Sequence, residues 1–354
     1  MITRIMDVST EPLNMDYIKE ASAILRNGGL VAFPTETVYG LGGDATDKEA
    51  SRKIYAAKGR PSDNPLIVHI AKFSQLEAIS KDLPENAKKL ADAFWPGPLT
   101  MVVNKNEVVP YETTGGLDTV AVRMPNNPVA LALIEESGCM IAAPSANTSG
   151  RPSPTKASHV YEDLSGKIEA ILDGGSVDIG LESTIVDLTE DVVTILRPGY
   201  INMDMLREVV GEVRMDPGIV YNDKGTTSGA RPKAPGMRYK HYAPKGDLTI
   251  ISGEEDVVVA KINEMTKAAL DNGQRVGIIA TSESADRYKD GHVLVIGDRA
   301  DEGSIAHNLY DILRQFDEIG VDVIYSESFA TPKMGQAIMN RLLKAAGQKT
   351  IEVE

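Results

Sequence analysis

The chain has 354 residues, enough for two domains, and its 42% hydrophobic and 25% charged residues are typical of a folded globular protein. Acidic residues outnumber basic ones by 51 to 37, and the net charge of −14 excludes a basic surface over the whole molecule but leaves room for a local basic cleft. The single cysteine, Cys139, excludes an internal disulfide and any multi-cysteine metal site. A single cysteine is typical of a reducing compartment, so a cytoplasmic location is expected; the sequence also has no membrane-length apolar run and no signal-peptide pattern.

Apolar runs alternate with helical patterns up to residue 211, which predicts a large α/β or α+β domain over residues 1–211. The expected strands are Leu30–Phe33, Leu66–Ala71, Leu99–Val103, Thr119–Met124, Met140–Ala143, Ala170–Leu172, Ser183–Leu188 and Val193–Leu196. The expected helices are Met15–Asn27, Asp47–Lys58, Glu85–Phe94, Pro128–Ser137, Thr155–Asp163 and Asp204–Val210. Asp47, Thr155 and Asp204 suit helix N-caps, and Pro128 suits a first helical turn.

Prolines and glycines are frequent in residues 212–247, where no periodicity survives, so this stretch is predicted to be a linker. Residues 248–354 alternate strand and helix patterns, which predicts a small doubly wound parallel sheet. Its expected elements are the strands Leu248–Ile251, Arg275–Ala280, Val293–Ile296 and Val321–Tyr325 and the helices Glu254–Leu270, Ser304–Ile319 and Gly335–Ala346. The sequence G-x-G-x-x-G is absent, so no dinucleotide cofactor is predicted for this domain.

The familiar catalytic signatures are missing from the sequence, including the phosphate-binding loop, the zinc-binding helix motif and the nucleophile elbow. The five histidines lack metal-ligand spacing, so no protein-bound metal is expected. Cys139 begins an apolar run and is interpreted as a core residue rather than a nucleophile. The remaining candidates are polar residues at strand ends and turns, where binding sites tend to be built.

The first candidate segment is PTETVYGLG, residues 34–42, which follows an expected strand. Its threonines and Glu36 present hydroxyls and a carboxylate, and its glycines permit close approach of the backbone to a ligand. An ordinary glycine-rich turn is the alternative interpretation.

The second candidate segment is KGRPSDNP, residues 58–65, a local basic excess in an acidic chain. Lys58 and Arg60 in a stiff loop, with Ser62 and Asn64 as neutral donors, suit a polyphosphate, and both cations are expected near a cleft surface. The alternative is that these cations only complement the dipole at a helix C-terminus. His69 lies in the next apolar strand, where a lone histidine is usually a satisfied core residue, and a ligand contact is the alternative.

The third candidate segment is APSANTSGRPSPT, residues 143–155, whose hydroxyls and backbone N–H groups can form an anion nest. A flexible loop is the alternative. Three further candidates are at strand ends: Arg123, Ser183 and Arg197. The positive charge of the two arginines, together with that of Lys58 and Arg60, is enough to balance a triphosphate and a carboxylate.

Seven segments in register resemble the threonylcarbamoyl-AMP synthase family. They are PTETVYGLGGDA (34–45), KGRPSDNPLIVHI (58–70), FWPGPLT (94–100), LDTVAVRMP (117–125), IAAPSANTSGRPSPT (141–155), ESTIVDL (182–188) and LRPG (196–199). APGMRYKHYAP (234–244) and GQAIMNRLLKAAG (335–347) look like the family's long two-domain form, so the resemblance covers essentially the whole chain.

The resemblance implies a YrdC-like twisted open mixed sheet with helices over 1–211, a linker that covers the active site over 212–247, and a Rossmann-like parallel-sheet domain over 248–354. It also implies a reaction. L-threonine captures carbon dioxide or bicarbonate as a carbamate, a carbamate oxygen attacks the α-phosphorus of ATP, and pyrophosphate leaves. Mg²⁺ would enter with ATP, and no organic cofactor is expected.

Carried over residue by residue, the family's functional groups form three sets. The catalytic set is Lys58, Arg60, Ser145 and Asn147. The threonine-binding set is Thr35, His69, Arg123, Ala143 and Ser183. The ATP-binding set is Lys58, Ser62, Asn64, Thr119, Ser145, Ser153, Arg197, His241 and Tyr242.

The implied partner is a tRNA-modifying threonylcarbamoyl-transferase complex, and no membrane partner is expected. One alternative function is an RNA-binding factor that uses the basic cleft, and weak RNA binding is compatible with either function. Another is a hydrogenase-maturation carbamoyltransferase, but one cysteine cannot supply the zinc fingers of those proteins.

Overall fold

The computed structural model of the protein describes residues 1–220, 234, 241–329 and 333–354. The described residues form two compact units. The first unit takes its residues from 1–149, 153–178 and 182–239, and the second from 150–152, 179–181 and 240–354. Most of the expected linker, 221–233 and 235–240, lies outside the described residues.

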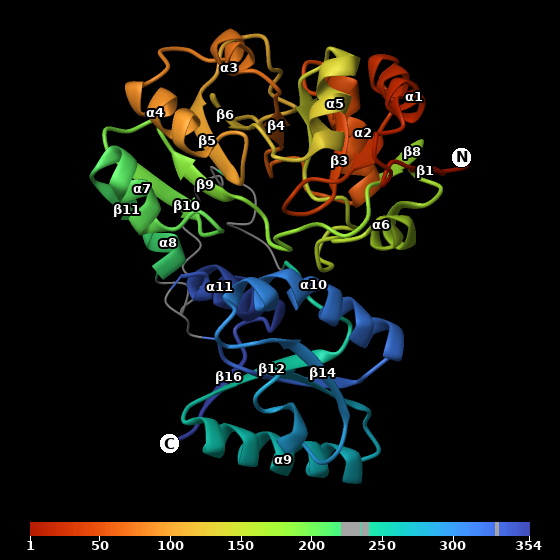
Figure 1. Ribbon diagram of the computed structural model, residues 1–354, viewed down its shortest axis with the longest axis vertical. Helices are drawn as coiled ribbons and strands as arrows, with labels where there is room; N and C mark the ends of the chain where they lie inside the picture. The colour runs from red at the N-terminus through yellow and green to blue at the C-terminus, as the bar shows by residue number, and fades with distance from the viewer. Residues whose placement is uncertain (221–233, 235–240, 330–332) are drawn as a thin grey trace. The chain divides into compact units, whose positions relative to one another are not determined.

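The first unit is a mixed sheet with helices (Figure 1). Its strands are β1 (Arg4–Asp7), β2 (Val31–Phe33), β3 (Gly40–Asp44), β4 (Ile67–His69), β5 (Leu99–Asn104), β6 (Thr119–Arg123), β7 (Ile141–Ala142), β8 (Ala170–Asp173), β9 (Thr184–Asp187), β10 (Val193–Arg197) and β11 (Val213–Met215). Its helices are α1 (Met15–Arg26), α2 (Lys48–Lys58), α3 (Phe73–Ile79), α4 (Glu85–Phe94), α5 (Pro128–Ser137), α6 (Ala157–Leu164), α7 (Met203–Val210) and α8 (Pro217–Val220).

Within the described residues the strands of this sheet run in the order β1-β8-β2-β3-β7-β4-β6-β5-β9-β10-β11. Parallel and antiparallel pairs alternate irregularly, which confirms the expected mixed sheet. Strand β2 shows how the sheet separates two apolar clusters. Val31 and Phe33 join the cluster that includes α1 and α5, whereas Ala32 joins the cluster that includes α2 and α4.

Local capping chemistry fixes several helix boundaries. The Asp47 side chain accepts from the Glu49 N–H at 2.8 Å and starts α2, as expected, and Gly59 ends this helix with a left-handed φ of 60°. The expected caps at Thr155 and Asp204 are wrong. Helix α6 begins after Lys156, and in α7 the side chain of Asn202 accepts the capping hydrogen bond while Asp204 lies in the first turn.

Strand β3 is not among the strands expected from the sequence, and this is the main difference in the first unit. Glycine is disfavoured in strands, so local propensity argues against β3. Tertiary packing requires the glycine instead. A Cβ on Gly42 would lie 2.7 Å from Cγ2 of Ile141 and 2.9 Å from Cε1 of Phe33. Short elements such as β1, α3 and β11 were also not anticipated.

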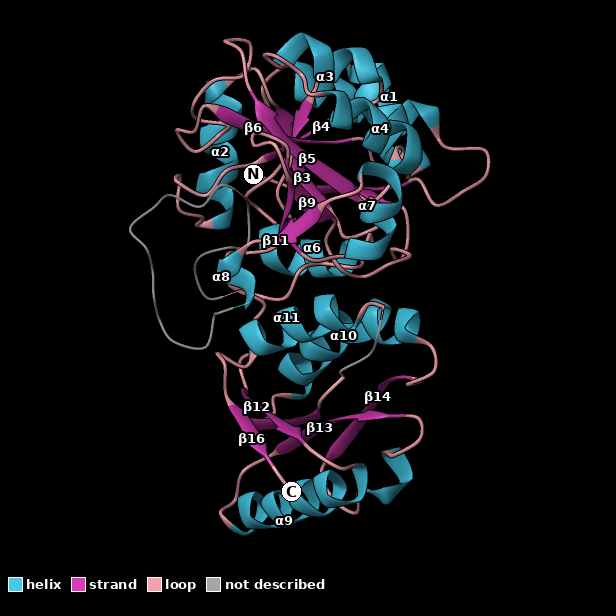
Figure 2. Cartoon of the chain, turned by 90° about the vertical axis from the view of Figure 1, so that its left-hand side faces the viewer, coloured by secondary structure: helices cyan, strands magenta, loops and turns pink. Residues whose placement is uncertain are grey.

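The second unit contains a parallel sheet in the order β14-β13-β15-β12-β16 within the described residues, as the alternating pattern predicts. Helices α10 and α11 cover one face and α9 covers the other (Figure 2). The elements are β12 (Asp247–Ser252), α9 (Glu255–Asp271), β13 (Val276–Thr281), the 3-10 helix η1 (Ala285–Arg287), β14 (His292–Gly297), α10 (Glu302–Ile319), β15 (Val323–Glu327), α11 (Gly335–Ala345) and β16 (Thr350–Glu352).

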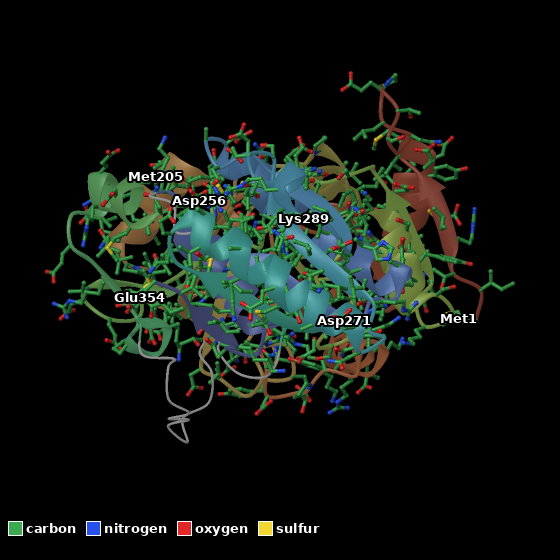
Figure 3. The ribbon with its side chains drawn as sticks, turned by 90° about the horizontal axis from the view of Figure 1, so that it is seen from below. Met1, Met205, Asp256, Asp271, Lys289 and Glu354 are labelled. Atoms are coloured by element: carbon green, nitrogen blue, oxygen red, sulfur yellow. The ribbon has the colours of Figure 1, made fainter. Side chains whose placement is uncertain are left out.

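Helix α9 is amphipathic, with Val258, Ile262 and Ala269 buried and its two ends marked by the exposed Asp256 and Asp271 (Figure 3). In the same unit the Arg314 guanidinium donates to the carbonyl of Pro152 at 2.6 Å. No described helix is both long enough and apolar enough to cross a membrane.

The crowding around Gly42 gives a stability prediction. We expect Gly42→Ala to lower the free energy of unfolding by about 1–3 kcal/mol, because a methyl group must displace Ile141 or Phe33 in a packed core. Urea unfolding followed by the fluorescence of Trp95, the only tryptophan in the sequence, reports on the first unit. Gly40→Ala is the matched variant and should cost less, since its Cβ would have its nearest neighbours at 3.3 Å. An equal loss in both variants would contradict the packing explanation.

Candidate active site

Three polar residues lie directly opposite one another on the neighbouring strands β4, β6 and β5 at the centre of the first sheet. His69 of β4 pairs with Arg123 of β6, and Arg123 pairs with Thr100 of β5. Residues directly opposite each other on neighbouring strands point to the same face, so an imidazole, a guanidinium and a hydroxyl lie side by side. The pairing of strands far apart in sequence therefore brings together two of the predicted threonine-binding residues.

The turn between β2 and β3 closes onto Arg123. Nη1 of Arg123 donates to Oγ1 of Thr37 at 2.8 Å, and Nη2 lies 2.6 Å from Oε1 of Glu36. Oγ1 of Thr37 in turn lies 2.9 Å from Oγ1 of Thr35. The hydroxyl of Thr35 also donates to the Val38 carbonyl, which holds the turn in shape. All of these side chains are buried, with Arg123 only 4% exposed.

His69 is held in its neutral form. Burial lowers the pKa of His69 to about 3, and the positive charge of Arg123 adds to this effect, whereas the carbonyls of Ile67 and Ile141 oppose it. Nδ1 of His69 lies 3.2 Å from the Ile67 carbonyl. A neutral imidazole can therefore hydrogen-bond a ligand beside a guanidinium without charge repulsion.

Lys58 ends α2 and reaches into the third candidate segment. Its Nζ donates to the carbonyl of Ser145 at 2.5 Å and also to the carbonyl of Asn147. Oγ of Ser145 donates to Oδ1 of Asn147 at 2.6 Å, and a bridge between Gly40 and Ser145 connects this loop to β3. The expectation that Lys58 lies near a cleft surface is wrong, because it is 2% exposed. The loop folds around its ammonium group and exposes little of it.

A third group forms at the start of β9. Oγ of Ser183 lies 2.7 Å from Oγ1 of Thr100, and the Arg197 guanidinium donates to both the hydroxyl and the carbonyl of Ser183. Because Thr100 also pairs with Arg123, Ser183 and Arg197 are connected to the three paired residues His69, Arg123 and Thr100. Nearby in sequence, the buried Ser153 donates to a carboxylate oxygen of Glu182 at 2.7 Å.

The loop after Lys58 holds the remaining predicted residues of the second segment. Arg60 donates to the carbonyls of Asn64 and Pro65 at 3.2 and 3.1 Å. Asn64 is 2% exposed, and its Oδ1 is buried without a hydrogen-bond partner among the described residues. Ser62 is exposed. Thr119 lies at the opposite end of β6 from Arg123, about 13 Å along the strand.

Two of the predicted ATP-binding residues belong to the second unit rather than the first. His241 and Tyr242 belong to the second unit, where the ring of Tyr242 stacks on Tyr310 with centroids 5.1 Å apart. Ala143 remains in the first unit and is bonded through its N–H to the Ile67 carbonyl at 2.8 Å.

Two polar residues at the site were not among the predicted candidates: Thr100 and Glu182. Each lies within a segment of the family resemblance, but only the pairing of distant strands and loops shows what it contacts. Cys139 is half-buried rather than part of the core as expected, and burial raises the pKa of its thiol to about 11, which disfavours a nucleophile. The described residues contain no group of three or more His, Cys, Asp and Glu side chains that could hold a metal ion.

The fold places the chain among the YrdC-like proteins. Escherichia coli YciO shares the fold with a TM-score of 0.51 and 24% identity, over 56% of this chain and 96% of that one. A family profile described as "Telomere recombination", which groups Sua5, YciO and YrdC, matches residues 23–199. A second profile, described as "Threonylcarbamoyl-AMP synthase, C-terminal domain", matches residues 201–347.

Relatives over the full length define the family more narrowly. Threonylcarbamoyl-AMP synthase of Pyrococcus abyssi is 51% identical over 95% of this chain and 96% of its own, and that of Bacillus subtilis is 48% identical over 98% of both. The crystal structure of P. abyssi Sua5 complexed with L-threonine matches with a TM-score of 0.92 and 49% identity, covering 99% of this chain and 100% of that one. The chain therefore belongs to the threonylcarbamoyl-AMP synthase family, a family of ATP-using synthases, in its long two-domain form.

The neutral state of His69 predicts a specific pH dependence of stability. Folding lowers the pKa of His69 from 6.5 to about 3, so below pH 6.5 the unfolded chain binds a proton that the folded chain does not. Stability is therefore lost as the pH falls, by about 2 kcal/mol at pH 5 from this group alone. We expect His69→Gln to flatten the dependence of the unfolding free energy on pH between 7 and 5 by this amount.

Urea unfolding followed by Trp95 fluorescence at several pH values measures the effect. His292→Gln, at an exposed position on β14, is the control for loss of a solvated histidine. Because His292 lies in the second unit, unfolding of this variant is followed by far-ultraviolet circular dichroism, and the slope should be unchanged. The same slope in wild type and His69→Gln would contradict a buried neutral imidazole.

Proposed function

We propose that this chain synthesises L-threonylcarbamoyl-adenylate from L-threonine, bicarbonate or carbon dioxide, and ATP, with release of pyrophosphate. The observation that carries the proposal is the buried cluster of Thr35, His69 and Arg123 next to the loop that folds around Lys58. The threonine-bound structure of a 49% identical relative supports the choice of amino acid.

The cluster offers complementary groups to each part of threonine. Arg123 is the candidate partner of the carboxylate, since a guanidinium and a carboxylate pair in a fixed geometry. Thr35 and the neutral imidazole of His69 suit the side-chain hydroxyl. Ser183 and the backbone at Ala143 complete the proposed pocket.

The cationic residues suit the nucleotide and the carbamate. Lys58, Arg60 and Arg197 supply positive charge where the triphosphate and the carbamate approach each other, and the polar groups of Ser145 and Asn147 add donors. The buried, unpartnered Oδ1 of Asn64 is available to a donor group of the nucleotide. The assignments of Ser62, Thr119, Ser153, His241 and Tyr242 to ATP remain predictions.

The proposed chemistry depends on orientation and electrostatics. The amine attacks carbon dioxide, a carbamate oxygen displaces pyrophosphate at the α-phosphorus, and no covalent bond to the protein forms. Mg²⁺ would enter as part of the MgATP substrate, held mainly by phosphate oxygens.

We further propose that the adenylate passes to a tRNA-modifying threonylcarbamoyl-transferase complex. Direct RNA binding is a weaker candidate, because no observation on the described residues favours it and the net charge is −14. RNA binding as the main role would appear as strongly salt-dependent affinity that ATP does not change. The cytoplasmic location is also still a prediction.

Pyrophosphate release tests the function. Purified protein with MgATP, L-threonine and bicarbonate should release pyrophosphate, and omission of either L-threonine or bicarbonate should reduce release to background. Arg60→Ala should lower kcat/KM by about 10²–10³-fold, because it removes a charge expected at the phosphates. Arg52→Ala, which removes an exposed arginine paired with Glu49 and Glu112, is the control. Release that does not require L-threonine would refute the proposal.

A further inference from the structure

Glu36 is a buried carboxylate whose bonding is incomplete. Glu36 is 5% exposed, and its Oε1 lies 2.6 Å from Nη2 of Arg123. The alignment of this contact does not meet hydrogen-bond geometry, and Oε2 also has no hydrogen-bond partner among the described residues. Charged oxygens in such a position are costly unless a donor satisfies them.

The hydrogen bonding of the Arg123 guanidinium is also incomplete, on the donor side. Its Nη1 donates to Thr37 and its Nε lies 3.4 Å from the carbonyl of Gly97, but Nη2 lacks a hydrogen-bond acceptor in the part of the chain that the structure describes. The pair thus leaves one donor group and one acceptor group unsatisfied on two adjacent, oppositely charged side chains. A ligand that satisfies both must present an anionic acceptor and a cationic donor a few bonds apart.

We infer that Glu36 binds the α-ammonium of the amino-acid substrate, so that the Glu36–Arg123 pair is a receptor for the zwitterion. This inference rests on the proposed function, in which Arg123 binds the carboxylate of threonine. The carboxylate then lies against Arg123 and the ammonium against Glu36, and the four charges alternate in sign. The buried charge sums to zero both before and after binding.

The same contact is compatible with the later chemistry. When the nitrogen becomes a carbamate it loses its positive charge but keeps one N–H, which Oε2 of Glu36 can still accept. Glu36 therefore orients the nitrogen and selects for an amino group at this position. The hydroxyl of threonine is recognised separately, by the groups around Thr35 and His69.

The experiment compares L-threonine with (R)-3-hydroxybutyrate, which keeps the carboxylate and the hydroxyl but lacks the ammonium. Binding of both to the full chain is measured by calorimetry, the weaker ligand by displacement. Glu36→Gln should weaken L-threonine binding by at least about 30-fold, because a neutral amide no longer balances the ammonium. It should not weaken the binding of (R)-3-hydroxybutyrate, because this ligand has no ammonium to lose and the substitution removes a negative charge next to its carboxylate.

The two possible roles of Glu36 predict different outcomes. If Glu36 only positions Arg123, both ligands lose affinity equally, and this outcome overturns the inference, as does an unchanged affinity for L-threonine. Glu169→Gln is the matched control, since Glu169 is a half-buried glutamate outside the site that accepts from the Leu30 N–H. It should leave both affinities unchanged.

If Glu36→Gln does not fold, Glu36→Asp gives the same test. It keeps the charge but withdraws it by one methylene, so the preference for L-threonine over (R)-3-hydroxybutyrate should fall while the affinity for the latter holds. An equal loss for both ligands again overturns the inference. Failure of the proposed function looks different, because wild-type protein would then bind L-threonine poorly and release no pyrophosphate.

Discussion

A guanidinium buried in the middle of a sheet is the constraint on which this site depends. Arg123 is 4% exposed, and a charge in that position is tolerated only where its neighbours are anionic, neutral or hydrogen-bond acceptors. Each neighbour meets the requirement in its own way. His69 remains uncharged, Thr37 contributes an oxygen, and Glu36 contributes the opposite charge. The polar groups of this part of the sheet thus follow from the presence of one buried cation.

The backbone around this cation is built to hold it in place. Strand β3 can approach β2 and β7 closely only because Gly42 has no side chain, and this approach sets the turn that carries Thr35 and Glu36. Lys58 performs a similar role at the end of α2, where its ammonium holds the Ser145–Asn147 loop. Two buried cations therefore hold two loops through hydrogen bonds within the protein. This preorganisation lowers the cost of binding.

Local patterns were sufficient to predict most of the helices, the central strands and the parallel C-terminal sheet, because each has its own periodicity and boundaries. They could not predict β3, since its glycines are favoured by tertiary crowding and disfavoured by propensity. Family resemblance named Arg123 and His69, but their proximity depends on the register between β4 and β6, which is a nonlocal property. For the same reason the contact of Thr100 with Ser183, and the burial of Lys58, appear only in three dimensions.

The depth of the cations also explains how so acidic a chain can be suited to an anionic nucleotide. A net charge of −14 gives no long-range attraction for ATP, so affinity must arise from contacts at short range. Arg197 is 5% exposed and Lys58 2%, and charges at that depth are screened little by salt and act through a lower dielectric than surface charges do. Under the proposed function, a few buried cations at the nucleotide outweigh many solvated acids, because the acids interact mainly with water. In this chain, charge balance at the site is better judged from the burial of each group than from the sum over all residues.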